Sequence, residues 1–302
     1  MDSLLLFFVS LACSLELPDE QQETSRPGAI LKYDLLSNSQ SGINYPAEHV
    51  GAFAPLVCPW SCFNGVAQYV PEAVAQDPTT NQITITAERD ADGLVTSGCL
   101  ETKKVWSTAQ SEDIKTHGYL EIWSTLPIKT NGENFKGSFP AIWLVGREEI
   151  WPHGGEIDIL LAVNGDPSIE MSLHSSNHWG ANAQHPAKNP INMTTDLTKD
   201  HLIAGFEWNI QEEIRKIDLT WWFTWYDLGS HSWLSENTTM ALMEGGGNDY
   251  HDFYETFKSE GFSLTIHLGE GEAMYGSNDV LVDGQPQFIN IVSAKVFGFP
   301  EK

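Results

Sequence analysis

Short runs in which apolar and polar residues alternate dominate this chain. Alternation with a period of two is typical of a half-buried β-strand. Residues that favour turns, namely Gly, Asn, Asp and Pro, separate the runs. The pattern predicts strands at 82–87, 119–126, 219–226, 262–268 and 288–297, and short helical turns at 198–201 and 250–260. Because helical periodicity is scarce, we expect an all-β protein with a single large domain.

The most aromatic of these predicted strands has two distinct faces. Trp221, Phe223 and Trp225 alternate with Trp222, Thr224 and Tyr226. We expect the first set to face the core. The second set either lines a groove or is covered by loops, and a purely structural role for both faces remains open.

Two carboxyl groups share one side of a strand predicted at 156–161. Successive side chains of a strand point to opposite faces, so Glu156 and Asp158 lie on one face and Ile157 and Ile159 on the other. Paired carboxyl groups allow a site to hold one group protonated and the other ionised. A solvent-facing edge strand explains an isolated Glu-x-Asp equally well, so the flanking residues decide between the two.

The flanking segments are 139–146 (FPAIWLVG), 151–161 (WPHGGEIDILL), which contains both carboxyl groups, and 172–174 (SLH). Together they resemble the laminarinase-type members of glycoside hydrolase family 16, and among them the fungal secreted β-1,3(4)-glucanases. The resemblance is strongest from 118 to 174, and it extends more loosely to 96–98 with Lys103 and to 204–208. It implies a concanavalin-like jelly-roll sandwich of two curved antiparallel sheets, with a sugar-binding cleft on the concave sheet.

The resemblance also implies a retaining mechanism with Glu156 as nucleophile, Asp158 as a supporting acid and a further Glu as acid/base. That further Glu is absent here. Its position is Leu160 in a regular strand and Leu161 if the strand contains the one-residue bulge of the laminarinases. Proton transfer by such a group contributes about 10²–10⁴-fold to the rate. We therefore expect hydrolysis to be impaired.

A late loop offers two substitutes for the missing acid. Glu270 and Glu272 lie in the run 269–276 (GEGEAMYG), which borders the cleft in the family. The family usually places a Trp in this loop, and here Tyr275 is the aromatic residue available.

Sugar binding has more support than sugar cleavage, because the chain contains 11 Trp in 302 residues. An indole ring offers an apolar face to a sugar while its N–H stays available as a donor. Trp143 and Trp151 match cleft tryptophans of the family, and His174 matches a position near the nucleophile. Trp179 is a further candidate, although its loop could equally be peripheral.

The net charge of the chain limits the kinds of molecule that we expect it to bind. The 41 Asp and Glu outnumber the 16 Lys and Arg, which gives a net charge of −25. Such a chain is a poor partner for nucleic acid or an anionic membrane, whereas a neutral polysaccharide such as a β-1,3- or mixed-linkage glucan is compatible with it. We expect a monomer with no cofactor and no catalytic metal.

The N-terminal residues predict export. An apolar run at 4–12 is followed by Ala12-Cys13-Ser14, which resembles a signal-peptidase site, and the run is too short to span a bilayer. We assign 1–14 to a signal peptide, 15–40 to an N-terminal arm, and 41–302 to the family 16-like domain. In an extracellular protein, Asn192 and Asn237 would be glycosylation acceptors.

Removal of the signal leaves Cys58, Cys62 and Cys99. An odd number predicts one disulfide and one free thiol. Either a local Cys58–Cys62 bridge or a bridge from one of them to Cys99 is compatible with the spacing.

Three functions remain open at this point. The chain is a secreted β-glucan-binding protein with impaired catalysis, an active endo-β-1,3(4)-glucanase that uses a recruited acid, or a structural protein without sugar affinity. Binding and turnover of laminarin distinguish them.

Overall fold

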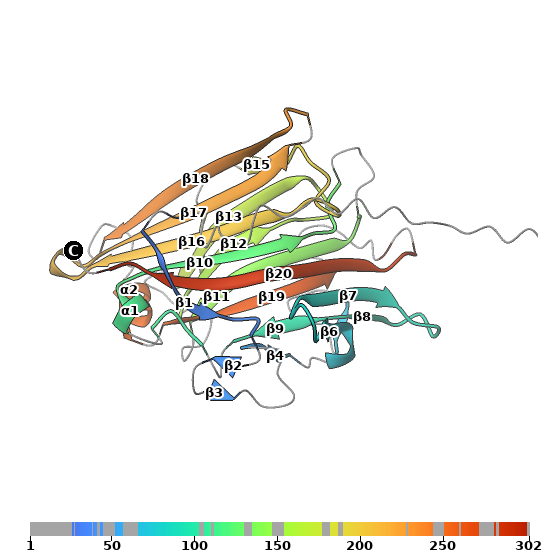
Figure 1. Cartoon of the computed structure of the whole chain (residues 1–302), viewed down its shortest axis with the longest axis horizontal. Helices are drawn as coiled ribbons and strands as arrows, with labels where there is room; N and C mark the ends of the chain where they lie inside the picture. Colours follow the sequence, from blue (N-terminus) through green and yellow to red (C-terminus); the bar gives the residue numbers. More distant parts are fainter. Residues whose placement is uncertain are drawn as a thin grey trace, which may run out of the picture.

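The computed structural model describes most of the chain beyond its N-terminal segment. The described residues are 26, 28–37, 39–40, 43–44, 52–56, 66–102, 106–109, 112–129, 135–146, 154–176, 182–186, 190–227, 229–243, 251–259, 261–271, 281 and 284–300. Two large β-sheets pack face to face, with their long strands running along the long axis of the molecule (Figure 1). This is the jelly-roll sandwich that the sequence predicts.

The first sheet has ten strands in the order β18-β17-β16-β10-β20-β7-β8-β5, with β1 added to β20 and β6 to β7. Its strands are β1 (Ile30–Asp34), β5 (Gln68–Tyr69), β6 (Val74–Gln76), β7 (Ile83–Arg89), β8 (Val95–Ser97), β10 (His117–Thr125), β16 (Leu202–Gln211), β17 (Lys216–Asp227), β18 (Ser232–Met243) and β20 (Gln287–Gly298). All of its pairs are antiparallel except β5 with β8.

The second sheet has eight strands in the order β14-β13-β12-β11-β19-β9-β4, with β15 added to β13. Its strands are β4 (Ala54–Pro55), β9 (Cys99–Glu101), β11 (Ser138–Gly146), β12 (Glu156–Leu161), β13 (Ser168–Ser176), β14 (Asn182–Pro186), β15 (Ile191–Asn192) and β19 (Phe262–Glu270). A separate hairpin consists of β2 (Ser39–Gln40) and β3 (Ile43–Asn44).

One hydrophobic core fills the space between the sheets. Leu120 and Phe206 of the first sheet belong to the same buried cluster as Ile142, Ile157 and Leu264 of the second. Burial of apolar surface is the dominant favourable contribution to the free energy of folding. All five strands that the sequence predicts at 82–87, 119–126, 219–226, 262–268 and 288–297 are present.

The aromatic strand β17 is two-faced, as its alternation predicts. Trp221, Phe223 and Trp225 are buried in the core, whereas Trp222, Thr224 and Tyr226 are half-buried on the opposite face. The core side of β17 therefore contributes three large rings to the packing between the sheets.

Helices are few in the described part of the chain. They are α1 (Glu112–Lys115), α2 (His251–Ser259) and the 3₁₀ turns η1 (Pro71–Ala73) and η2 (Glu212–Ile214). Both α1 and α2 contact Trp208, which donates its indole N–H to the carbonyl of Ile114 and packs on Phe257. The helical turn expected at 250–260 is thus α2, and the chain also turns at 198–201, where the backbone N–H of Asp200 donates to the carbonyl of Asp196. None of the described helices has the length and apolar character needed to cross a membrane.

Cysteine pairing is partly resolved by this fold. Cys99 on β9 is a buried free thiol, and burial raises its pKa well above the ordinary value. The bridge from Cys58 or Cys62 to Cys99 that the spacing allowed is therefore not formed. Cys58 and Cys62 lie outside the described residues.

Candidate functional site

The face of the second sheet that points away from the core gathers the polar residues of the candidate site. Strand alternation decides which side chains lie there, because their neighbours in sequence belong to the core cluster. We call this surface the site face. It carries Phe139, Ala141 and Trp143 of β11, Glu156, Asp158 and Leu161 of β12, Glu170, Ser172 and His174 of β13, and Thr265 and His267 of β19.

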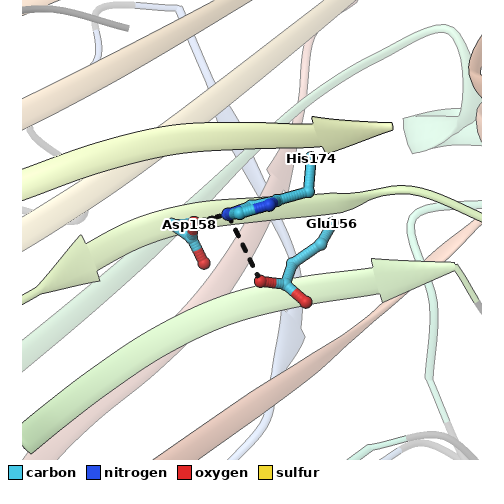
Figure 2. Close-up of side chains that lie close together, drawn as sticks. All are labelled: Glu156, Asp158 and His174. Atoms are coloured by element: carbon cyan, nitrogen blue, oxygen red, sulfur yellow. Dashed lines mark ion pairs between the residues drawn. The ribbon is translucent and has the colours of Figure 1, made fainter. Parts of the chain in front are cut away.

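Glu156, Asp158 and His174 meet on this face, as Figure 2 shows. The Nε2 atom of His174 lies 3.2 Å from Oδ2 of Asp158 and 3.9 Å from Oε1 of Glu156. The hydroxyl of Ser172 donates a hydrogen bond to the same oxygen of Asp158. Asp158 is only 2% exposed, whereas the side chain of Glu156 keeps 18% exposure. Glu156 is therefore the more accessible of the two carboxyl groups.

A β-bulge in β12 determines which residue after Asp158 returns to the site face. Trp143 pairs with Asp158, but the next residue back along β11, Ile142, pairs with Leu160. Ile159 is the extra residue, and both Ile159 and Leu160 face the core. Leu161 consequently lies on the site face, where it packs with Trp143.

The first sheet supports this bulge across the core. The indole N–H of Trp221 donates a 2.9 Å hydrogen bond to the backbone carbonyl of Asp158. A buried backbone carbonyl needs a hydrogen-bond donor. The core-facing Trp221 supplies one, so the position of Leu161 is fixed by packing as well as by register.

Trp143 is held in a defined orientation next to the carboxyl groups. Its indole Nε1 donates a 3.0 Å hydrogen bond to Nδ1 of His267, and the two rings meet edge to face. His267 is enclosed by the rings of Tyr69 and Phe139. Burial lowers the pKa of His267 to about 3, so the imidazole is neutral and Nδ1 can accept this bond.

Within the described residues, Glu156, Asp158 and His174 also form the group of possible metal ligands, since one ligand atom of each lies within 4.8 Å of the others. The same atoms already serve one another as ion-pair partners. A carboxylate–imidazole cluster with an adjacent indole can bind and polarise a neutral sugar as well as it can bind a cation.

Comparison with known proteins identifies this arrangement. Residues 63–205, which contain β11 to β15 and the start of β16, match the model of the XgeA-like catalytic GH16 domain. Over these residues, just under half of the chain, the protein is similar to the GH16 laminarinases. A probable endo-1,3(4)-β-glucanase of Aspergillus clavatus is 40% identical to this chain over 62 residues. That match covers 20% of this chain and 8% of the Aspergillus protein.

Solved structures with the same fold cover most of this chain. The endo-1,3-β-glucanase of Streptomyces sioyaensis superposes with a TM-score of 0.63 at 15% identity, over 92% of this chain and 99% of the other. A GH16 protein of the Bacteroides ovatus mixed-linkage glucan locus, in complex with a G4G4G3G product, gives a TM-score of 0.58 at 17% identity over 83% and 96%. At these identities the likeness concerns the fold.

Several residues that the sequence proposes are not part of the described site face. Trp151, Trp179, Tyr275 and Glu272 lie outside the described residues. The two proposed glycosylation acceptors are exposed on β-strands: Asn192 is on β15, where it accepts a hydrogen bond from Ser168, and Asn237 is on β18, the edge strand of the first sheet.

Glu170 is a site-face residue that the sequence did not single out. It lies on β13 directly opposite Leu161 and is exposed. The alternation of β13 alone places it on the same face as Ser172 and His174. Its proximity to Leu161 could not be found without the pairing of β12 with β13, because the bulge shifts that register.

Glu270 does not reach the site face. It is a fully buried residue at the end of β19, on the core side of the strand and opposite Ser138. One of its oxygens accepts a hydrogen bond from the backbone of Leu281, and the other has no hydrogen-bond partner among the described residues. The structure therefore gives no support to Glu270 as the recruited acid.

Burial of Glu270 makes the stability of the protein depend on pH. Desolvation raises the pKa of Glu270 from 4.5 to about 8. Between these values the folded state keeps a proton that the unfolded state releases, so this contribution to stability falls as pH rises. We expect Glu270→Gln to match the wild type in free energy of unfolding near pH 4.5 and to exceed it by about 2–4 kcal/mol near pH 8.5. Urea unfolding at both pH values measures the difference, and a constant offset would contradict it.

Proposed function

We propose that this chain is a secreted β-glucan-binding protein built on a GH16 glucanase scaffold, with strongly impaired hydrolysis. Glu156 acts as the retained nucleophile, Asp158 as its supporting acid, and Trp143 with His174 as sugar-contacting residues. The glucan bound by the structurally similar Bacteroides protein supports a mixed-linkage or β-1,3-linked ligand.

The observation that carries this proposal is the place of Leu161. It lies on the site face three positions beyond Asp158, in one hydrophobic cluster with Trp143, Ala141 and Phe139. The resemblance assigns the acid/base carboxyl to this position, and a retaining site needs its two carboxyl groups roughly 5–5.5 Å apart. An aliphatic side chain cannot transfer a proton, whereas it can pack against the apolar face of a sugar.

Export and glycosylation belong to the same proposal. Exposure of Asn237 and Asn192 makes both accessible to a glycosylating enzyme. A polysaccharide ligand too large to enter a cell requires the protein to meet it outside.

A paired assay on the purified protein tests the function. We expect calorimetry to detect binding of laminarin oligosaccharides, with little release of reducing ends in the same period. Trp143→Ala should weaken binding on the order of 10-fold, equivalent to about 1.4 kcal/mol, because the indole packs on the sugar ring. The matched control is Trp233→Ala, which removes an exposed indole from β18 of the first sheet.

Each outcome selects one function. Rapid release that Glu156→Gln abolishes would show a working glucanase and would refute the proposed impairment. Absence of both binding and release would leave the structural role as the remaining possibility.

A further inference from the structure

Glu170 is the carboxyl group that β13 brings next to the position of the missing acid. It is the direct cross-strand partner of Leu161 on the site face. Side chains that are directly opposite in an antiparallel pair have Cβ atoms about 4.5–5.5 Å apart. The carboxyl group of Glu170 can therefore reach over the side chain of Leu161 toward the sugar.

The surroundings of Glu170 leave its carboxyl group available. The residue is exposed, and no hydrogen bond or ion pair ties it to another described residue. Further along the same face of β13 lie Ser172 and His174, which contact Asp158 and Glu156. One strand therefore presents both a group that contacts the nucleophile and a carboxyl group beside the position of the lost acid.

We propose that Glu170 is the acid/base of the residual hydrolysis catalysed by this protein. The inference rests on the proposed function, because it requires a glucan on the site face with Glu156 as nucleophile. In the first step an oxygen of Glu156 bonds to the anomeric carbon while the glycosidic C–O bond breaks. The proton of Glu170 passes to the departing oxygen, so the leaving sugar is a neutral alcohol.

The second step restores both residues. The Glu170 carboxylate takes a proton from a water molecule, whose oxygen bonds to the anomeric carbon as the ester bond to Glu156 breaks. Water is the only co-reactant, and one glycosidic bond is hydrolysed per cycle.

The position of Glu170 also explains why this chemistry should be slow. Neighbouring strands lie about 4.7–4.9 Å apart, so Glu170 starts one strand away from the backbone position of the lost acid. Misplacement of a catalytic group by about 1 Å can cost on the order of 10²-fold in rate. Glu170 is thus expected to recover part of the lost proton transfer and to leave hydrolysis impaired.

The test is Glu170→Gln, which removes the proton and keeps the shape of the side chain. We expect reducing-end release from laminarin over a day to fall on the order of 10-fold or more, with laminarin affinity within about twofold of the wild type. The pH–rate profile should lose its alkaline limb, which reports the general acid. The matched control is Glu88→Gln, an exposed carboxyl of the first sheet, which should change neither quantity.

A second variant makes the assignment specific. In a Leu161→Glu background, the carboxyl group introduced at position 161 should act as the acid/base in place of Glu170. Adding Glu170→Gln to that background should therefore reduce reducing-end release less than twofold. Equal effects of Glu170→Gln in both backgrounds would indicate a general electrostatic role and would overturn the proposal.

Failure of this inference can be distinguished from failure of the proposed function. Laminarin binding with no release, or with release unaffected by Glu170→Gln, refutes Glu170 as acid/base and leaves the binding function intact. Fast release that requires both Glu156 and Glu170 supports Glu170 and refutes the proposed impairment. Absence of laminarin binding refutes both.

Discussion

Leu161→Glu is expected to raise laminarin hydrolysis on the order of 10²-fold, which lies at the lower end of the typical contribution of general acid–base catalysis. The bulge at Ile159 turns residue 161 to the site face beside Trp143, so a carboxyl group there points toward Glu156. Part of the full effect is already supplied by Glu170, which is why the gain lies at the lower end. Reducing-end assays on laminarin, with Glu156→Gln added to show dependence on the nucleophile, measure it.

Two control variants show whether the expected gain in hydrolysis comes from a carboxyl group at position 161. Leu161→Gln has the same size and polarity without a transferable proton, and it should leave hydrolysis at the wild-type level. Leu160→Glu places its carboxyl group in the core, where Leu160 is fully buried, and should destabilise the fold without a gain in activity. If Leu160→Glu restored hydrolysis and Leu161→Glu did not, the acid/base position would be 160 and the role assigned to the bulge would be wrong.

The sequence predicts the strand that carries the site more accurately than it predicts which residues of that strand lie on the site face. Alternation places Glu156 and Asp158 together without any knowledge of the fold, and the structure has both on one face. Beyond Asp158, alternation would turn Leu160 to that face, and only the family resemblance suggests Leu161. The hydrogen bond from Trp221 to the carbonyl of Asp158 explains why the bulge is stable, and it comes from the other sheet.

Contacts between strands that are distant in sequence account for what the sequence could not predict. Glu170 acquires its significance from its pairing with Leu161, and His267 from its hydrogen bond to Trp143, 124 positions away. For Glu270 the family resemblance is misleading, because it suggests a loop that borders the cleft. In the structure it continues β19 with its side chain turned into the core, where burial and not catalysis accounts for its raised pKa.

Azide is expected to accelerate turnover of a dinitrophenyl β-laminaribioside on the order of 10²-fold, the typical contribution of the general base that it makes unnecessary. Dinitrophenolate leaves without protonation, so formation of the glycosyl ester on Glu156 does not need the lost acid. Hydrolysis of that ester does need a base to activate water. Azide is already a strong nucleophile, and it should release the sugar as the β-glycosyl azide.

Mass spectrometry of the protein and chromatography of the product provide the measurement. Without azide, a disaccharide adduct should accumulate on the peptide that contains Glu156, and Glu156→Gln should remove both the adduct and the azide effect. The acceleration should be larger for Glu170→Gln than for the wild type, because that variant also lacks the carboxylate that assists water and repels the anion. Absence of adduct and of any azide effect would show that Glu156 is not a poised nucleophile. Calorimetric binding of laminarin does not depend on a covalent step. Such a result would therefore leave the proposed glucan-binding function intact.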